Sequence, residues 1–160
     1  MTKLKIGTSA PSFSLPDQTG QVKTIHDYKA DYIVLFFYPK DMIPGCTVEA
    51  EGFSEKIAEF KKLNAEVLGI SGGDAASKLK FCKKNNLKIS LLADEDFSVS
   101  KKFEVYGKKS FMGKTYDGIH RKTFIINRAG EIVQIYDEVK PEQHTEQVLN
   151  FLMNIGQNIE

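Results

Sequence analysis

The longest apolar run of the chain covers residues 32–38 and is directly followed by Pro39. Because the run is short and rich in β-branched and aromatic side chains, it predicts a buried central strand. Farther along, apolar residues from Phe53 to Phe60 recur at the helical spacing i, i+4, i+7, which predicts an amphipathic helix over about 47–63. Cys46 therefore falls where a loop at the carboxyl end of a strand becomes the N-terminus of a helix.

Strands and helices continue to alternate along the rest of the chain. The pattern predicts an edge strand at 10–17 with a return strand at 22–25, strands at 66–71 and 89–93, helices at 75–85 and 97–105, a strand at 121–127, a hairpin turn at 128–131, its partner strand at 132–136, and a last helix after Pro141. This order predicts an α/β protein in which a mixed sheet has helices on both faces.

Two details of this pattern concern possible function. The helix at 75–85 is expected to begin at an N-cap, Asp74, and to present Ala75, Leu79 and Cys82 on one face. Residues 107–120 are expected to form a long glycine-containing loop, and loops of this length within a compact domain tend to be functional. In mixed sheets, sites gather at the carboxyl ends of the central parallel strands, where Cys46 is predicted to lie.

With 160 residues, the chain is predicted to be one domain over 1–160, because this length buries a core without disulfide staples. The first residues contain no apolar stretch of signal-peptide length, and no segment approaches membrane-spanning length. A cytoplasmic protein without membrane contact is therefore expected. Thiols are kept reduced in that compartment, which favours catalytic, redox-active or plainly buried cysteines over a structural bridge.

The net charge of +1 gives no global indication of nucleic-acid binding. Residues 78–122 nevertheless carry 12 Lys and Arg against 5 Asp and Glu. This excess is typical of a solvated lysine-rich face, and alternatively of a mildly basic surface that meets an acidic partner or an anionic substrate. The aromatic residues of 107–120 form no evident stacking platform, so nucleic acid is not an expected partner.

Cys46 has the features of a reactive thiol. At a helix N-terminus, backbone N–H groups and the helix dipole favour negative charge and lower the pKa of a thiol. Pro44 and Gly45 keep the preceding loop short and stiff. Acidic residues follow, so a lowered pKa needs another cation, which Arg121 at the start of a strand can supply. The alternative is that Cys46 is a small buried hydrophobe and Arg121 a surface ion-pair partner.

Cys82 lies 36 residues after Cys46, so the two cysteines do not form a C-x-x-C redox motif. It is either a helix residue packed on the core or a second thiol that resolves an oxidised Cys46. If the helix at 75–85 holds it facing inward, the two sulfurs cannot meet without local unfolding, because a disulfide needs close Cα atoms.

The sequence shows no other recognisable pattern of catalytic or ligand-binding residues. The three histidines have no metal-ligand spacing with each other or with the cysteines, so no metal site is expected. The sequence has no P-loop, no dinucleotide glycine fingerprint and no G-x-S-x-G motif, so no cofactor is expected.

At this point the residues resemble a known family. The segments 37–41 (Phe-Tyr-Pro-Lys-Asp) and 44–49 (Pro-Gly-Cys-Thr-Val-Glu) resemble the peroxidatic-cysteine motif of the peroxiredoxins, in the branch called bacterioferritin comigratory protein or peroxiredoxin Q. The resemblance continues through 10–13, 91–94 and 116–124, in order and spacing across essentially the whole chain. It implies a thioredoxin-like fold and an antioxidant oxidoreductase: a thiol peroxidase that is reduced by thioredoxin.

The resemblance also assigns roles to single residues. Cys46 matches the peroxidatic cysteine, Pro39 the shielding proline and Arg121 the arginine beside the thiolate. Glu49 matches a position that is commonly acidic in this branch and that would hold the arginine, and Gly45 belongs to the implied substrate pocket.

The second cysteine is assigned in the same way. Some members of the branch place the resolving cysteine five residues after the first, where this chain has Glu51. The chain therefore resembles the subgroup whose resolving thiol lies in the following helix, at Cys82. The implied cycle converts Cys46 into a sulfenic acid, condenses it with Cys82 to an intramolecular disulfide, and restores both thiols with thioredoxin or a similar dithiol. A monomer is expected.

One position departs from the family pattern Pro-x-x-x-Thr-x-x-Cys, because its threonine falls on Ile43. In the family this hydroxyl helps to bind and polarise the peroxide, and isoleucine keeps only the β-branched shape. Losing one preorganised polar group at a charge-developing centre can cost about 100- to 1000-fold in rate. The alternative function is therefore a peroxidase-impaired redox sensor or binding protein on the same scaffold.

Overall fold

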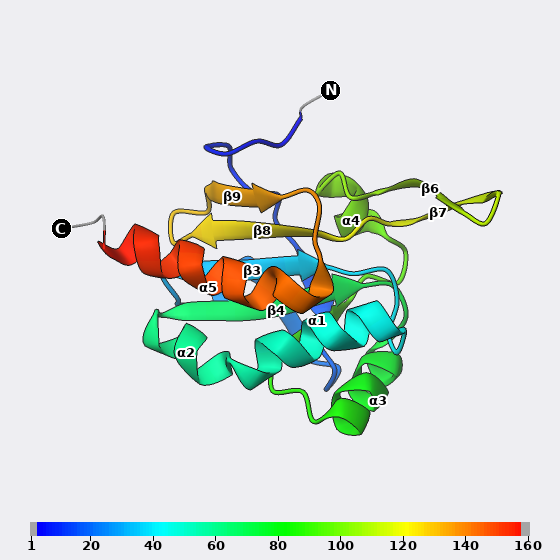
Figure 1. Ribbon diagram of the computed structural model, residues 1–160, viewed down its shortest axis with the longest axis horizontal. Coiled ribbons are helices and arrows are strands. Elements are labelled where there is room, and N and C mark those ends of the chain that lie inside the picture. Colours follow the sequence, from blue (N-terminus) through cyan, green and yellow to red (C-terminus); the bar gives the residue numbers. More distant parts are fainter. Residues whose placement is uncertain (1–2, 158–160) are drawn as a thin grey trace.

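The structure is a computed structural model, which describes residues 3–157. Its centre is a five-stranded sheet in the order β5-β4-β3-β8-β9 (Figure 1). Strands β3, β4 and β5 run parallel, whereas β8 is antiparallel to both β3 and β9. The predicted mixed sheet is therefore confirmed, and the long apolar run forms its middle strand.

The elements follow the predicted order. The strands of the central sheet are β3 (Tyr32–Phe37), β4 (Ala65–Ser71), β5 (Ser90–Ala93), β8 (Lys122–Asn127) and β9 (Ile132–Tyr136). Two antiparallel pairs lie outside it, β1 (Ser14–Pro16) with β2 (Val22–Thr24) and β6 (Tyr106–Phe111) with β7 (Lys114–Ile119). The helices are α1 (Pro44–Glu55), α2 (Ile57–Lys62), α3 (Ala75–Asn85), α4 (Ser98–Lys102), α5 (Pro141–Gln157) and a 3₁₀ turn, η1 (Ile25–Asp27).

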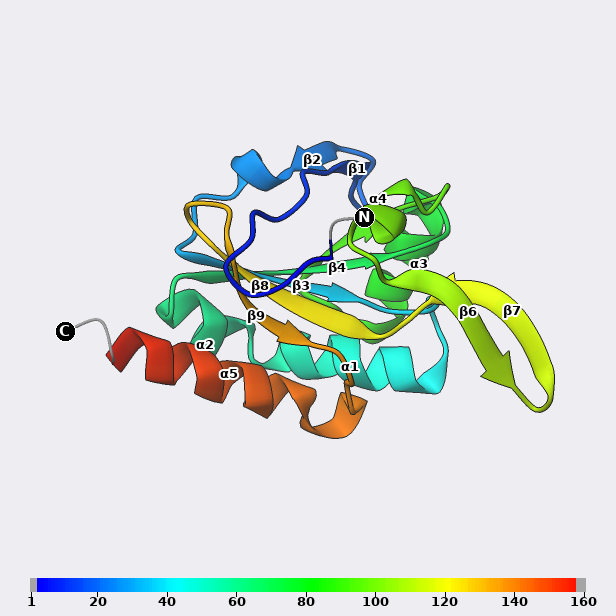
Figure 2. The ribbon, with the colours of Figure 1, turned by 90° about the horizontal axis from the view of Figure 1, so that it is seen from above.

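Both faces of the sheet are covered, as predicted. Successive side chains of a strand point to opposite faces, so Val34 and Phe36 of β3 join one apolar cluster while Leu35 and Phe37 join the other. The first cluster includes residues of α1, α2, α3 and α5, and the second includes residues of β1 and α4. Figure 2 shows α1, α2 and α5 along one side of the sheet and β1, β2 and α4 along the other.

The helix expected at about 47–63 is two helices. It begins earlier, at Pro44, whose fixed φ and missing N–H suit the first helical position. It then breaks at Lys56, where φ is −100° and ψ is 14°, before α2 continues. The predicted core-facing side chains Phe53 and Phe60 are fully buried on either side of this break. Because α1 starts at Pro44, Cys46 lies inside the first helical turn and not just before it.

Helix α3 has the predicted bounds, and Asp74 caps it by accepting a 2.8 Å hydrogen bond from the Ser77 N–H. The predicted buried face is partly wrong. Leu79 is 36% exposed, whereas Lys78 is fully buried together with Phe81 and the nearly buried Cys82. The buried face of α3 therefore includes Lys78 in place of Leu79. The apolar pattern did not predict this because a lysine is normally assigned to the surface.

The segment expected to be a loop at 107–120 is a hairpin, β6–β7, which projects from the body of the protein (Figures 1 and 2). Its turn lies at Met112 and Gly113, with φ of 52° and 79°, the left-handed pair that suits the twist of a two-residue hairpin. The strands were missed because they lack apolar alternation, and the turn lacks an Asn-Gly or Asp-Gly signal. The helix expected at 97–105 is shorter, because α4 covers only Ser98–Lys102. Phe97 before it and Glu104 after it have positive φ values, which do not fit a right-handed helix.

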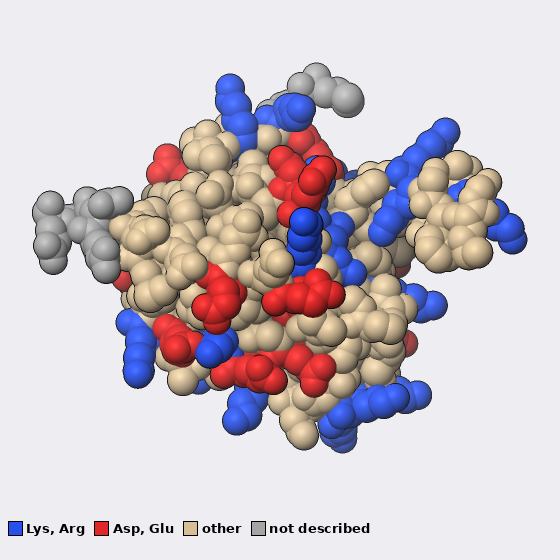
Figure 3. Space-filling view, viewed as in Figure 1, with Lys and Arg blue, Asp and Glu red and all other residues tan. Residues whose placement is uncertain are grey.

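The lysines of 78–122 are divided among α3, the connection from α3 to β5, α4, the hairpin and β8. Figure 3 shows the hairpin lysines set apart from the body, while acidic side chains gather over the face formed by α1 and α5. Among residues 3–157, none of the helices combines the length and apolar character needed to cross a membrane.

Candidate active site

Cys46 is the third residue of α1 and follows the carboxyl end of β3, at the edge of the sheet that the sequence pattern predicts. Its side chain is 0% exposed. The helical hydrogen-bond ladder begins with the Thr47 N–H, which donates to the Ile43 carbonyl over 3.0 Å. The amides of Gly45 and Cys46 precede this bond, so neither has an acceptor within the helix.

Sheet pairing brings Arg121 to this thiol across 75 residues of sequence. Phe37, the last residue of β3, pairs with Lys122 of the antiparallel strand β8, so Arg121 lies just past the end of β3. One guanidinium nitrogen, Nη2, is 3.3 Å from Cys46 Sγ, and the other, Nη1, donates to Glu49 Oε1 over 2.7 Å. Two of the predicted site residues thus converge on the sulfur, one directly and one through the arginine.

The pKa of Cys46 differs from the expectation of a lowered value. Burial raises the pKa of the thiol and outweighs three opposing effects: a backbone hydrogen bond from Lys40, the charge of Arg121 and the hydrogen bond from Arg121. The stabilising groups are therefore in place, but the sulfur is covered. The degree of burial is set by packing of distant segments, which the local sequence around the cysteine does not report.

Glu49 is fully buried in α1, one helical turn after the cysteine. Burial raises the pKa of its carboxyl to about 7, and the charge and hydrogen bond of Arg121 only partly offset this effect. Its second oxygen, Oε2, has no hydrogen-bond partner among the described residues. Glu49 therefore fixes the orientation of the guanidinium at the cost of a poorly solvated carboxyl.

Gly45 packs directly against the arginine. A Cβ atom at this position would lie 3.2 Å from Arg121 Nη2, closer than ordinary van der Waals contact. Ile43 is the N-cap of α1, with extended backbone angles and a side chain that is 37% exposed. Its side chain forms no capping hydrogen bond, since isoleucine has no polar atom.

Pro39 is half-buried in the loop between β3 and α1. It lines a groove of about 610 Å³ whose other walls include Met42 of the same loop, residues of α3, and Phe97. Met42 has a φ of 73°, in the left-handed region that a non-glycine residue rarely adopts. Cys46 does not line this groove. The loop that contains Pro39 reaches the sulfur through the backbone hydrogen bond of Lys40.

Cys82 is 7% exposed on the inner face of α3 and belongs to the same apolar cluster as Cys46. Both cysteines are free thiols. Burial and the nearby charge of Asp41 raise the pKa of Cys82 to about 11, with Lys78 opposing. The folded helix therefore presents Cys82 as an inert, inward-facing thiol, one of the two placements that the sequence left open.

Sequence reasoning missed the ion pair between Asp41 and Lys78, which lies beside Cys82. Asp41 stands inside the motif and could have been flagged there, but no sequence signal marked Lys78.

Within residues 3–157, no three or more His, Cys, Asp or Glu side chains are grouped so that they could hold a metal ion.

Comparisons with known proteins agree with this geometry. The AhpC/TSA family matches residues 6–135. The chain is 46% identical to Peroxiredoxin Bcp of Escherichia coli over 152 residues, which is 95% of this chain and 97% of that protein. It is 37% identical to Peroxiredoxin Bcp of Bacillus subtilis over 154 residues, covering 96% of this chain and 98% of that protein.

Solved structures extend the similarity to three dimensions. A crystal structure of a Xylella fastidiosa PrxQ mutant superposes with a TM-score of 0.90 at 32% identity, covering 98% of this chain and 99% of that one. Peroxidoxin BcpB from Mycobacterium tuberculosis gives a TM-score of 0.84 at 32% identity, covering 95% and 98%. These matches confirm the thioredoxin-like fold. The chain belongs to the AhpC/TSA family and, within it, to the Bcp/PrxQ peroxiredoxins, which are thiol peroxidases.

Proposed function

We propose that Cys46 is the peroxidatic cysteine and that its thiolate reduces hydrogen peroxide and organic hydroperoxides. The sulfur attacks one peroxide oxygen, a sulfur–oxygen bond forms, and the oxygen–oxygen bond breaks. The leaving oxygen takes a proton and departs as water or alcohol, and a sulfenic acid remains. The observation that supports this most strongly is the 3.3 Å contact between Arg121 Nη2 and Cys46 Sγ at a helix N-terminus.

The surroundings suit the charge that develops in this reaction. The amides of Gly45 and Cys46 have no acceptor within α1 and lie at its positive end, where a peroxide oxygen gaining negative charge is stabilised. Arg121 stays protonated at all relevant pH values, so it favours the thiolate before attack and the leaving oxygen during it. Pro39 is proposed to shield this chemistry from bulk water.

In the proposed cycle Cys82 resolves the sulfenic acid. Its thiolate attacks the sulfur of Cys46, hydroxide leaves as water after protonation, and a Cys46–Cys82 disulfide forms. The attack requires α3 to open, because the folded helix buries Cys82 and burial raises the pKa of Cys82 to about 11. Thioredoxin or a similar dithiol then reduces the disulfide and returns both thiols. The proposed active form is a cytoplasmic monomer.

Two variants test these assignments. In Cys46→Ser, peroxide consumption with thioredoxin and its reductase should disappear. In Cys82→Ser, the first turnover should persist while recycling fails and the sulfenic acid accumulates. Peptide mapping after one equivalent of peroxide should find the Cys46–Cys82 crosslink in the parent protein. Undiminished turnover in Cys46→Ser would refute the peroxidatic assignment, and absence of the crosslink would remove Cys82 from the cycle.

A second candidate function rests on Ile43, which leaves the N-cap of α1 without a hydroxyl. Without this group the scaffold would act as a peroxide sensor or binding protein with slow turnover. Comparing the parent with Ile43→Thr in the same assay separates the two functions. Equal, rapid turnover in both proteins supports the peroxidase and excludes the impaired sensor, whereas turnover restored only by Ile43→Thr supports the sensor.

A further inference from the structure

Lys78 is a fully buried lysine that the proposed chemistry does not use. It lies on the inner face of α3, one helical turn before Cys82. Its Nζ is 2.9 Å from Asp41 Oδ2 and 2.6 Å from Ser71 Oγ, and it also contacts the Gly72 carbonyl. All three ammonium protons therefore have acceptors, which is what a buried lysine requires.

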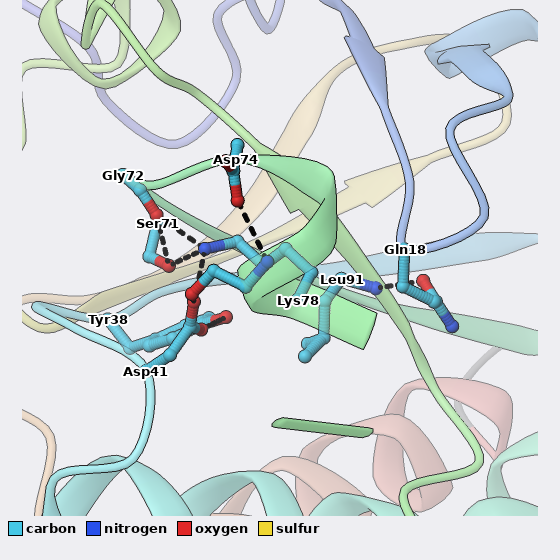
Figure 4. Close-up of polar contacts among 9 residues, drawn as sticks. Gln18, Tyr38, Asp41, Ser71, Gly72, Asp74, Lys78 and Leu91 are labelled. Atoms are coloured by element: carbon cyan, nitrogen blue, oxygen red, sulfur yellow. Dashed lines mark hydrogen bonds and ion pairs between the residues drawn. The ribbon is translucent and has the colours of Figure 1, made fainter. Parts of the chain in front are cut away.

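Asp41 is satisfied in the same way. Its Oδ2 also accepts from Ser77 Oγ over 2.7 Å, and its Oδ1 accepts from the buried Tyr38 hydroxyl over 2.7 Å. Figure 4 shows the lysine Nζ meeting Asp41, Ser71 and Gly72 at one point. We call the five groups Asp41, Ser71, the Gly72 carbonyl, Ser77 and Lys78 the Lys78 cluster.

The Lys78 cluster joins three segments that are distant in the sequence. Asp41 lies in the loop that leads to Cys46. Ser71 is the last residue of β4 and Gly72 follows it, and Ser77 and Lys78 belong to α3. The contacts therefore attach the helix that bears Cys82 to the loop before the helix that bears Cys46. In the described structure, α3 cannot move away from the sheet without separating Lys78 from Ser71 of β4, and it cannot move away from the loop before α1 without separating Lys78 from Asp41.

The energetic weight of such a cluster depends on what replaces it. A buried ion pair adds little to the free energy of folding compared with a well-packed apolar pair, because both charges lose their hydration. Removing only one partner is different, since it leaves an uncompensated charge in the closed state. Opening of α3 returns both groups to water, so the cluster acts directly on the equilibrium between closed and open helix.

We propose that Lys78 is a positioning residue that holds α3, and with it Cys82, in the closed state through Asp41. The step it controls rests on the proposed role of Cys82, because only a resolving thiol needs to be released. Asp41 belongs to the loop that leads to Cys46. A movement of that loop is therefore transmitted to α3 through the carboxylate of Asp41. The two cysteine-bearing segments are thereby held closed together.

The primary test measures opening of α3 without peroxide chemistry. In a Cys46→Ser background, the rate at which 5,5′-dithiobis(2-nitrobenzoate) modifies Cys82 reports how often α3 opens. Lys78→Met removes the charge and keeps an unbranched side chain that is one atom shorter, and we expect modification on the order of 100-fold faster. An unchanged rate overturns the proposal.

A control separates a local from a global effect. Ile126→Ala removes a fully buried side chain of β8 on the opposite face of the sheet. It should destabilise the whole fold, as urea unfolding will show, while Cys82 modification under native conditions stays within about threefold of the parent. If Ile126→Ala accelerates modification as strongly as Lys78→Met at equal global stability, the cluster has no specific role.

Milder and compensating variants keep the proposal testable if Lys78→Met fails to fold. Ser71→Ala removes one acceptor of the Lys78 ammonium and should accelerate modification about fivefold, the effect of one hydrogen bond. The double variant Asp41→Asn with Lys78→Met removes both charges and should restore part of the protection lost in Lys78→Met alone. Strict additivity of the two substitutions would exclude the ion pair as the holding element.

A second experiment, on protein that keeps both cysteines, tests whether Lys78 also affects disulfide formation. After a peroxide pulse and acid quench, Lys78→Met should form the Cys46–Cys82 disulfide faster, and less Cys46 should reach the sulfinic acid. Faster modification of Cys82 without a disulfide would uphold the holding role and refute resolution by Cys82. Unchanged modification with normal disulfide formation would refute the holding role and leave the proposed function intact.

Discussion

Each of the two cysteines lies beside an ion pair of a carboxylate and a cation, and the two pairs are arranged in opposite ways. At Cys46 the cation, Arg121, contacts the sulfur, and the carboxyl of Glu49 holds that cation from behind. At Cys82 the cation of Lys78 is turned toward Asp41 and the end of β4. The first pair acts on its thiol, whereas the second acts on the segment that carries its thiol.

The protonation of the two thiols reflects this difference. Burial raises the pKa of both thiols, and at both the neighbouring cation opposes the increase while the neighbouring carboxylate adds to it. At Cys46, hydrogen bonds to the sulfur from Arg121 and from the Lys40 backbone also oppose the increase. A buried charge beside a cysteine is therefore not sufficient to predict a thiolate. Whether the cation donates to the sulfur, as Arg121 does, or to other acceptors, as Lys78 does, decides how strongly the ion pair can stabilise a thiolate.

Arg121 carries the largest expected effect in this comparison. Arg121→Met should lower the rate of sulfenic acid formation by about 100- to 1000-fold, because it removes a donor from the site of developing charge. Arg121→Lys should recover little, since one ammonium cannot contact both Sγ and Glu49 as the two guanidinium nitrogens do. Competition kinetics against a haem peroxidase measures both variants, and near-parent rates in Arg121→Lys would show that charge alone suffices.

Glu49 offers a test through pH. Its pKa is raised to about 7 in the folded protein from an ordinary value of 4.5, so the folded state binds the proton more tightly. The resulting stabilisation is complete below about pH 4.5 and is lost as the pH rises through 7, which lowers the free energy of unfolding by about 3 kcal/mol. Glu49→Gln cannot titrate and should flatten this slope in urea unfolding at pH 5 to 8. A slope equal to that of the parent would contradict the raised pKa.

Gly45 tests how closely the arginine must be placed. Gly45→Ala puts a methyl group 3.2 Å from Arg121 Nη2 and should displace the guanidinium by a few tenths of an ångström. We expect about a tenfold loss in the rate of sulfenic acid formation, because misplacement of a preorganised donor weakens it without removing its charge. Urea unfolding should stay close to that of the parent, and a loss of stability that accounts for the lost rate would indicate a folding defect.

A change in stability at Ile43 is the smallest of these expected effects. A threonine at this N-cap can accept a hydrogen bond from a first-turn amide, so Ile43→Thr should stabilise the protein by about 1 kcal/mol. Valine keeps the β-branched shape without the hydroxyl, so Ile43→Val serves as the matched control. Equal stability of the Thr and Val variants would show that the hydroxyl does not cap α1.

The parts predicted well from the sequence are those that local chemistry determines. The run at 32–38 predicts the central strand, and the helix that follows was predicted with a start about three residues too late. Arg121 was a candidate cation because of its place at the start of a strand, and the motif resemblance assigned it to a position beside the sulfur. The hairpin at 107–120 was missed because its stability depends on pairing between strands without apolar alternation. Lys78 was missed because burial of a charge becomes favourable only when Asp41 and Ser71 arrive from other segments.

The pKa of Cys46 could not be foreseen for a related reason. Helix position and the nearby cation are visible in the sequence, but the exclusion of water from the sulfur is a property of the packed core. Local features therefore predicted which groups meet at the thiol, and the balance between them depends on the complete fold.

The left-handed backbone of Met42 has a consequence for the direction of the catalytic cycle. Such a conformation costs about 1–3 kcal/mol at a non-glycine residue, and it persists here between the anchored Asp41 and the first turn of α1. The reduced, closed enzyme therefore holds conformational energy in the peptide that follows Asp41. This energy favours opening of the loop. In the proposed cycle, an opening of the loop during disulfide formation would release it, and closing of the loop during reduction would have to supply it again.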